Sequence, residues 1–404
     1  MKGGTLVKRL LSAVLSAVII LPWGIGSVHG ADGYTFKYTI DNGSITVTGA
    51  SGHGGVLDIP AKIDSLTVTS IGNGLFAGSD EIIAVNLPDS IVDIGDKAFS
   101  NCPKLNSVSI GSGTADIGKN AFSACPNLEC ISVSPANKTY RSVSGSLCKG
   151  GEMIVYAGGN EAVITDDISS VGKYAFFGRT NVSAVNIADT VTAVGDYAFA
   201  GCLALKSITL PDNVGYLGTY CFLSCTSLKY AELGSSLKRI PEYCFNGCDS
   251  LSTVQIPETV TDIGENAFYG CDSLKNLYIP PSVANIGTDA LGRKYGLRSG
   301  KVENIPQFTI SGISGSAAEN YASSYGLVFI EGKGIMMGDV NGDGVIDAKD
   351  ASAALCEYAV VSAGGKASFN DRQMMAADFN GDSILDAKDA SAILAYYAKL
   401  SVEN

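Results

Sequence analysis

The sequence predicts a mainly β solenoid of 23-residue repeats, followed by a small all-α module with two acidic loop-helix motifs. A segment that recurs every 23 residues, with an aromatic residue at the same place in each copy, predicts the solenoid. A stretch that occurs twice near the C-terminus predicts the helical module. We divide the chain into a signal peptide (1–30), an N-terminal β cap (31–70), the solenoid (71–300, with an insertion at about 134–170), a C-terminal cap and linker (301–337), and the helical module (338–404).

The N-terminus has the pattern of a secretory signal peptide. Basic residues at positions 2, 8 and 9 precede a run of twelve mostly apolar residues from Leu10 to Leu21. Small residues follow and place the cleavage near Gly30. A retained anchor is the alternative, but this run is short for a bilayer span. We therefore expect a secreted, extracellular mature chain without a transmembrane anchor.

The next segments indicate β structure. Apolar residues alternate with others from Tyr34 to Val47, which is the period of a half-buried strand and predicts the N-terminal cap. Each following repeat holds an L-x-x-I-x-L run, which is typical of a strand with alternate residues inward. Prolines such as Pro88 and Pro211 end several of these strands. The repeats begin at Ile71, Ile94, Ile117, Val171, Val194, Leu217, Ile240, Ile263 and Ile286.

Every complete repeat contains one phenylalanine that we expect to stack on the next along the core. Burying such a side chain contributes about 1.5 to 3 kcal/mol, so this column should dominate the stability of the array. Between Ile117 and Val171 the period is 31 residues too long, and we expect the extra residues to project as a hairpin. The column comprises Phe76, Phe99, Phe122, Phe176, Phe199, Phe222, Phe245 and Phe268.

Eleven cysteines in a secreted chain raise the question of disulfides. Six of them follow the column phenylalanine by three residues. Parallel side chains on neighbouring rungs do not converge, so we expect these six to be reduced core thiols. Cys130 and Cys148 lie off this column and are the more plausible bonded pair. The six column cysteines are Cys102, Cys125, Cys202, Cys225, Cys248 and Cys271.

The duplicated stretch places oxygen ligands as a calcium loop does, at positions 1, 3, 5, 9 and 12, with a backbone carbonyl at position 7. Four carboxylates in one loop would repel one another unless a cation neutralised them. We therefore predict two calcium ions. Position 12 is Asp instead of the usual Glu, and Ser383 replaces the turn glycine Gly344, so the second site should be weaker or distorted. The predicted ligands are Asp339, Asn341, Asp343, Val345, Asp347 and Asp350, then Asp378, Asn380, Asp382, Ile384, Asp386 and Asp389.

From Gly338 to about Leu400 these motifs resemble a type I dockerin. The resemblance implies that calcium orders the module and that it docks onto a cohesin of a scaffoldin in a cellulosome. The Ala-Lys pair at loop positions 10 and 11 departs from the Ser-Thr pair of the best-known dockerins, which bears on cohesin choice. The implied cohesin contacts are Ala348, Lys349, Leu355, Cys356 and Val360, then Ala387, Lys388, Leu394, Ala395 and Lys399.

Residues 347–353 and 386–392 are identical. A pseudo-two-fold arrangement would therefore present the same surface twice, rotated by half a turn. We put forward the hypothesis that a partner can bind in two orientations.

From about Tyr34 to Ile330 the repeats resemble BspA-like leucine-rich repeats, a diverse set of secreted and surface proteins, several of them adhesive. Outward strand positions are mostly small and polar. Tyr230, Glu232 and Tyr278 are the exceptions, and we single them out as a candidate recognition patch; ordinary surface is the alternative. The ligand of the array would be a protein or a glycan.

Composition argues against several function classes. The net charge is −12, and residues 338–404, with eleven acidic and five basic side chains, contribute −6 of it. Acidity of this kind repels nucleic acid. The mature chain would have no Trp and only His53, which disfavours a His-rich metal site, a Ser-His-Asp triad and a tryptophan platform for sugars. A dyad of Cys130 and His53 is conceivable, but nothing in the spacing favours it.

We therefore predict a secreted, non-catalytic cellulosome component. The alternatives are a surface adhesin, a carbohydrate-binding accessory of polysaccharide degradation, and a hydrolase carried by the array.

Overall fold

The computed structural model describes residues 24–29, 34–52, 54–332, 338–342, 346–379 and 384–402. These residues form two compact units. The first comprises the chain up to Phe122 together with Ile131–Arg141, and the second comprises Ser123–Cys130 and the chain from Ser142 onward.

The first unit opens with the N-terminal cap. β1 (Gly24–His29) pairs antiparallel with β2 (Thr35–Asp41), and β2 pairs antiparallel with β3 (Ser44–Ser51). Phe36 and Val47 are buried in this cap, as their alternation with polar residues predicted. Because β1 lies in the predicted signal peptide, cleavage near Gly30 would uncover the edge of β2.

In the repeats, each rung contributes two short parallel strands, one at the L-x-x-I-x-L run and one at the Ile-Gly corner. The pairing keeps the sequence register, so that Ile71 lies beside Ile94 and Ile94 beside Ile117. The strands of this unit are β4 (Gly55–Asp58), β5 (Lys62–Ile63), β6 (Leu66–Ile71), β7 (Ile82–Asn86), β8 (Asp93–Ile94), β9 (Ser107–Ile110) and β10 (Asp116–Ile117); β11 (Cys130–Val133) and β12 (Arg141–Val143) lie at its boundary.

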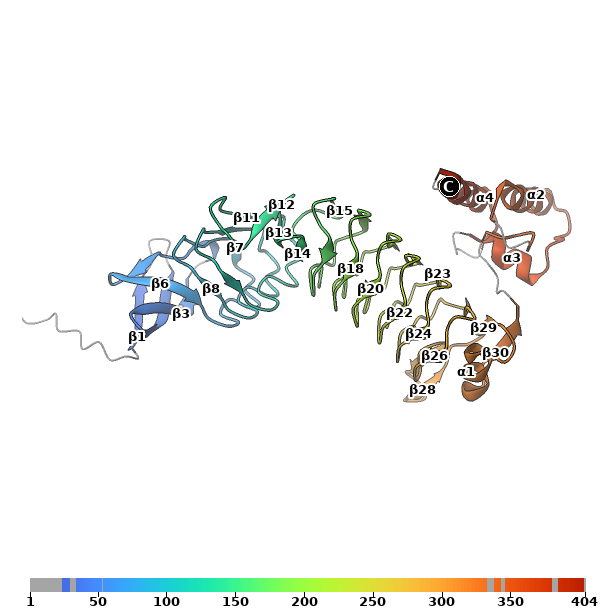
Figure 1. Ribbon diagram of the computed structural model, residues 1–404, viewed down its shortest axis with the longest axis horizontal. Helices are drawn as coiled ribbons and strands as arrows, with labels where there is room; N and C mark the ends of the chain where they lie inside the picture. Colours follow the sequence, from blue (N-terminus) through green and yellow to red (C-terminus); the bar gives the residue numbers. More distant parts are fainter. Residues whose placement is uncertain are drawn as a thin grey trace, which may run out of the picture. The chain divides into compact units, whose positions relative to one another are not determined.

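The second unit continues the β solenoid, with successive turns following one another along the chain (Figure 1). Its strands are β13 (Ser146–Lys149), β14 (Glu152–Val155), β15 (Glu161–Ile164), β16 (Ser170–Val171), β17 (Ala184–Ile187), β18 (Ala193–Val194), β19 (Ser207–Thr209), β20 (Tyr216–Leu217), β21 (Tyr230–Glu232), β22 (Arg239–Ile240), β23 (Thr253–Gln255), β24 (Asp262–Ile263), β25 (Asn276–Tyr278), β26 (Asn285–Ile286), β27 (Arg293–Gly296), β28 (Lys301–Asn304), β29 (Thr309–Gly312) and β30 (Val328–Glu331).

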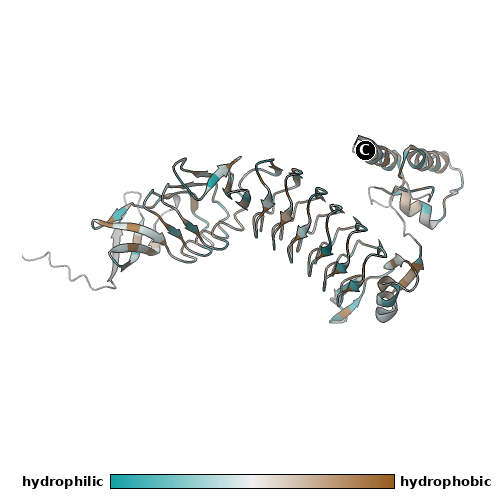
Figure 2. Ribbon diagram, in the orientation of Figure 1, coloured by the Kyte–Doolittle hydropathy of each residue, from teal (hydrophilic) through white to brown (hydrophobic). Residues whose placement is uncertain are grey.

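The predicted phenylalanine column is confirmed. All eight rings are at most 7 % exposed. Phe76, Phe99 and Phe122 stack in the first unit, and Phe176 to Phe268 stack in the second, with centroids 4.7 to 5.5 Å apart. Hydrophobic and hydrophilic positions recur from rung to rung around this core (Figure 2). Burial of the column therefore supplies the driving force that the periodicity indicated.

The insertion does not project as the expected hairpin. β13 and β14 form an antiparallel hairpin, but β14 continues the ladder by pairing in parallel with β16. The ring of Tyr156 then takes a place in the aromatic column, 4.4 Å from Phe176. The extra residues are retained in the core because they supply one more rung with its own aromatic side chain.

Arg179 stands where other repeats have the column cysteine, and it is only 4 % exposed. Its guanidinium donates to the carbonyl oxygens of Cys125 and Gly158 and lies over the Tyr156 ring. Burial lowers the pKa of this guanidinium. Arg179 thus satisfies carbonyl groups at the point where the insertion interrupts the regular spacing.

The column cysteines are buried thiols, as expected, and each of five donates to the carbonyl of the phenylalanine 26 residues earlier, as Cys248 does to Phe222 at 3.1 Å. The expectation of a bond between Cys130 and Cys148 was wrong. Cys130 is exposed, whereas Cys148 is buried and its thiol donates to the Ser146 carbonyl. The structure contains both side chains as thiols.

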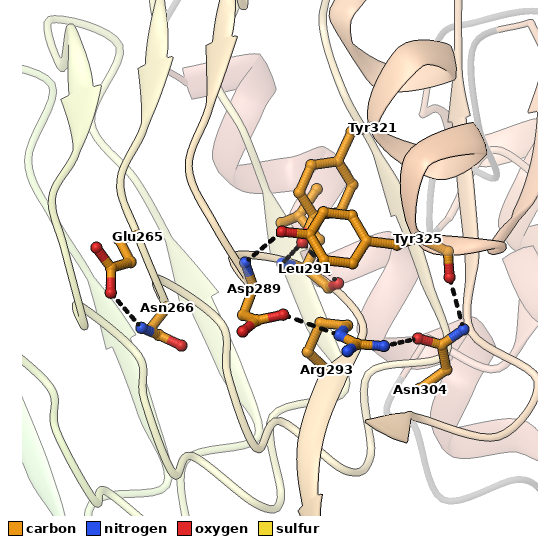
Figure 3. Close-up of polar contacts among 8 residues, drawn as sticks. All are labelled: Glu265, Asn266, Asp289, Leu291, Arg293, Asn304, Tyr321 and Tyr325. Carbon is orange, nitrogen blue, oxygen red and sulfur yellow. Dashed lines mark hydrogen bonds and ion pairs between the residues drawn. The ribbon is translucent and has the colours of Figure 1, made fainter. Parts of the chain in front are cut away.

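The last rung is closed by helix α1 (Ala317–Tyr325), whose phenols replace the carbonyl groups that a further repeat would supply (Figure 3). The Tyr325 hydroxyl accepts from the Asp289 N–H, and the Tyr321 hydroxyl accepts from the Leu291 N–H. Arg293 bonds Asp289 and lies over the Tyr325 ring. The N–H groups of Asp289 and Leu291, which have no further repeat beside them, are thereby satisfied.

The C-terminal module has three helices, α2 (Ala348–Ser362), α3 (Asp371–Ala377) and α4 (Ala387–Val402). Its core is small, and most of its residues fall in pairs related by the 39-residue repeat. Val340 corresponds to Phe379 and Ile346 to Leu385; similarly, Ala354 corresponds to the buried Ile393. The duplication seen in the sequence therefore extends to the packing of the module.

Candidate functional site

The first loop (residues 339–350) is tied to the start of α2 by the Asp350 carboxylate, which is fully buried. It accepts from the Asn341 N–H at 3.0 Å and from the Asp347 N–H at 2.9 Å. Asp347 in turn caps the helix by accepting from the Lys349 N–H, and this bond lowers the pKa of Asp347. Buried Asp339 accepts from the Gly342 N–H at 2.7 Å.

The second loop (residues 378–389) repeats this device. Asp389 is fully buried and accepts from the Asp386 N–H at 2.9 Å, and Asp386 accepts from the Lys388 N–H at 2.6 Å. The ammonium groups of Lys349 and Lys388 lie beside Asp347 and Asp386, but both side chains are about three-quarters exposed (77 % and 76 %). The aspartate at position 12 therefore holds each loop to the start of its helix through hydrogen bonds from backbone N–H groups.

Buried carboxylates fit a cation site because an ionised group out of water must be compensated. Asp339, Asp350 and Asp389 are each at most 4 % exposed, and each accepts a hydrogen bond from at least one backbone N–H. The donor set is all oxygen, which suits a hard cation such as calcium. The residues present therefore fit the predicted ion.

Part of each loop lies outside the described residues, namely Asp343, Gly344, Val345, Asn380, Asp382 and Ser383. Within the described residues, no three acidic, His or Cys side chains converge on one point that could hold a metal. Ile384 is described, and its side chain is 62 % exposed. The ligand set consequently stays a prediction.

The predicted docking residues of each copy define what we call a docking face, one on α2 and one on α4. Their described side chains lie on the surface. Leu355, Val360 and Leu394 are 47 %, 44 % and 47 % exposed, which is high for aliphatic side chains on a structured helix. The pairs Ala348 with Lys349 and Ala387 with Lys388 begin α2 and α4 and are exposed, as are Cys356 and Ala395. The side chain of Lys399 is outside the described residues. The two copies thus offer matching exposed faces.

Sequence reasoning missed Glu357. It lies on α2, is 3 % exposed, and accepts from the Ser368 hydroxyl at 2.6 Å and from the Phe369 N–H at 2.9 Å. These bonds lower its pKa. Glu357 fixes the segment that leads into α3. The copy has Tyr396 at this position, so the 39-residue comparison could have identified it as a difference.

The residues of the candidate array patch lie on two strands of the array. Tyr230 and Glu232 lie on β21, where Glu232 accepts from the Thr209 hydroxyl at 3.1 Å and pairs with Gln255. Tyr278 lies on β25, where it pairs with Ser311. Burial, followed by the neighbouring Glu232 carboxylate, raises the pKa of Tyr230.

Two remaining expectations concern catalysis and membranes. His53, the proposed partner of Cys130, lies outside the described residues. None of the helices in the described ranges combines the length and the apolarity needed to cross a bilayer.

Comparison with protein families matches residues 61–150 and 162–298 to the BspA type leucine rich repeat region, in 6 copies. Residues 337–396 match the dockerin type I domain. Both resemblances seen in the sequence are thereby confirmed. Proteins of these two classes are non-catalytic modules, and type I dockerins bind calcium. No curated protein matches the chain.

Several solved structures are similar to this chain. A leucine-rich repeat protein from Eubacterium ventriosum is 20 % identical over 66 % of this chain and 94 % of its own, with a TM-score of 0.45. The pneumococcal vaccine antigen PcpA is 17 % identical over 76 % and 99 %, with a TM-score of 0.44. A leucine-rich repeat protein from Bacteroides ovatus is 20 % identical over 79 % and 100 %, with a TM-score of 0.34.

Proposed function

Since the chain belongs to the BspA-type leucine-rich repeat family and ends in a type I dockerin domain, we propose that it is a secreted, non-catalytic cellulosome component. Its dockerin docks onto a cohesin of a scaffoldin, and its repeat array contacts a protein or a glycan. The observation that carries this proposal is the dockerin match together with two equivalent, exposed docking faces.

Calcium binding is the first step of the proposed mechanism. Two ions would be held by the carboxylates and carbonyls predicted above, among them the buried Asp339, Asp350 and Asp389. Bound calcium would supply the positive charge that neutralises these carboxylates. Asp350 and Asp389 then keep each loop attached to the first turn of its helix through the N–H bonds of Asp347 and Asp386.

Docking uses the surface of α2 and α4. Leu355 and Leu394 expose apolar area at equivalent places, and burial of such area against a cohesin would contribute about 25 cal/mol per Å². Lys349 and Lys388 stand at the rim, where they favour an acidic partner surface. Because the faces match, a cohesin can use either one.

The test is binding of the mature protein to a panel of labelled cohesins, with calcium and with excess chelator. We expect nanomolar to micromolar capture by at least one cohesin in calcium and its loss after chelation. Capture that persists without divalent ions, or no capture by any cohesin, contradicts the proposal. Hydrolysis of a plant polysaccharide by the isolated array would contradict its non-catalytic part.

The two-orientation hypothesis has its own test. The variants Ala348→Asp with Lys349→Glu, and Ala387→Asp with Lys388→Glu, each disable one face with matched chemistry. Either double variant alone should retain cohesin binding, with about a twofold loss from the statistical term, and the combination should abolish it. Loss of binding on disabling a single face rules out the second orientation.

A further inference from the structure

A row of four tyrosines lies on one side of the array, two residues before the column phenylalanine in four consecutive repeats. We call Tyr174, Tyr197, Tyr220 and Tyr243 the tyrosine ladder. Their rings stack with centroids 5.1, 4.6 and 4.5 Å apart and interplanar angles of 18°, 6° and 9°. All four are half-buried, so their outer edges remain open to solvent.

The fold does not require tyrosine at these positions. Each has a left-handed backbone, with φ between 55° and 64°, which costs an ordinary residue free energy and suits Gly or Asn better. The neighbouring repeats use Asn120 and Asn266 at the same position, with φ of 59° and 53°. A strained aromatic residue in four successive rungs therefore points to a use of the side chain.

The stacking of the rings determines which ligands or reactions the tyrosine side chains can support. The inner rings, Tyr197 and Tyr220, have both faces covered by neighbouring rings, so the ladder offers no row of flat faces on which a sugar could stack. What the ladder presents instead are ring edges, with the ring centroids of neighbouring phenols 4.6 and 4.5 Å apart. This geometry brings together the atoms that join when two tyrosines couple oxidatively.

We propose that the tyrosine ladder is a site of oxidative cross-linking, in which a one-electron oxidant such as a peroxidase with hydrogen peroxide forms dityrosine between rungs. Each of two neighbouring phenols loses one electron and one proton. The two radicals form a carbon–carbon bond between ring positions next to the hydroxyls, and the two ring hydrogens at that bond move to the oxygens as the rings regain aromaticity. The peroxide takes up the two electrons and two protons and becomes two waters.

The surroundings of the ladder give the coupling a direction. The Lys173 ammonium lies 5.3 Å from the Tyr174 ring centre and disfavours loss of an electron there. At the other end the Tyr243 hydroxyl donates to the Glu265 carboxylate at 3.2 Å, which can accept the proton as the electron leaves. We therefore expect the link between Tyr220 and Tyr243, the closest pair, to form first and the link between Tyr174 and Tyr197 last.

The test treats dilute, calcium-loaded full-length protein with horseradish peroxidase and limiting peroxide, and reads dityrosine fluorescence and cross-linked peptides by mass spectrometry. We expect intramolecular links between residues 23 apart, in the order given. Tyr220→Phe keeps the stacked ring but lacks the phenol, so it should lose both links of residue 220 and several-fold of the fluorescence. Tyr220→Asn, which uses the residue that the repeat from Ile263 carries at this position (Asn266), should do the same.

The matched control is Tyr216→Phe, since Tyr216 lies outside the ladder, only four residues before Tyr220, and is 56 % exposed. This variant should leave the yield unchanged. Links that form only between molecules, that join tyrosines outside the ladder, or that survive in both Tyr220 variants overturn the proposal. Its outcome is independent of cohesin binding.

Discussion

The repeat array buries mainly apolar side chains, whereas the dockerin buries carboxylates beside its apolar core. In the array, eight phenylalanines and a column of thiols fill the core, and the polar backbone is satisfied by the next rung. In the dockerin the core consists mostly of alanines and a few larger apolar residues, and the described residues include four buried carboxylates beside it, Asp339, Asp350, Glu357 and Asp389. The array can therefore be stable on apolar burial alone, whereas the dockerin depends on compensation of charge.

The array and the dockerin should therefore be destabilised by different kinds of change. A change in the array should act through cavity volume or through an unsatisfied backbone group. A change in the dockerin should act through ions and protons.

Removal of divalent ions should unfold the dockerin and leave the array intact. Binding at a thousandfold excess over Kd contributes about 4 kcal/mol, which is comparable to the whole stability of so small a core. Amide hydrogen exchange on the full chain should show loss of protection in α2 and α4 after chelation and none in β16 to β26. Re-addition of calcium is the control, and protection that persists in α2 without ions contradicts the prediction.

Phe222→Ala should destabilise the array by about 3 to 5 kcal/mol, because the stack on both sides of the ring leaves a cavity that cannot collapse. Urea unfolding followed by tyrosine fluorescence measures the effect. Cohesin binding in calcium should be unchanged. The adjacent, half-buried Leu223→Ala is the control and should cost clearly less.

Tyr321→Phe should destabilise the array by about 1 to 3 kcal/mol, because the Leu291 N–H and carbonyl both lose their partner in a buried setting. The exchange rates of Asp289 and Leu291 should rise first, since the cap opens there. Tyr295→Phe, at a position 54 % exposed, is the matched control. Equal effects of the two substitutions would rule out a capping role for Tyr321.

Glu357→Gln should have the smallest effect and should make the stability of the dockerin less dependent on pH. Hydrogen bonds from Ser368 and Phe369 lower the pKa of Glu357, so its contribution is complete above the unfolded pKa of about 4.3 and is lost as pH falls through the folded pKa. Thermal unfolding in saturating calcium between pH 3 and 7 should show a shallower acid slope for the variant. An unchanged slope contradicts the assignment.

Much of the array followed from the sequence because the 23-residue period fixes both register and core. The positions of Phe99 and Phe268 needed only counting. The insertion did not follow, since its rung is closed by Tyr156 and Arg179 in place of the Phe and Cys of the repeat. The missing disulfide shows the same limit, because the spacing of Cys130 and Cys148 says nothing about which side of the sheet each faces.

The dockerin was predictable as two copies of a loop and a helix, since acidic residues at fixed offsets carry their own chemistry. The hydrogen bonds that Asp350 and Asp389 accept within the loops could not be predicted. Their donors are backbone N–H groups, which nearly every residue type supplies. Glu357 escaped notice because it occurs in only one copy. The four tyrosines of the ladder recur visibly in the sequence. Their stacking, however, depends on a left-handed backbone conformation at each of them, which the sequence did not indicate.

The phenol closure of the last rung has a consequence for how such chains change length. The hydroxyls of Tyr321 and Tyr325 bond main-chain atoms of the corner they cover, at Leu291 and Asp289. Since every corner has nearly the same main-chain course, the terminal segment is interchangeable among repeats. We therefore expect the same closing segment to fit an array with more or fewer repeats.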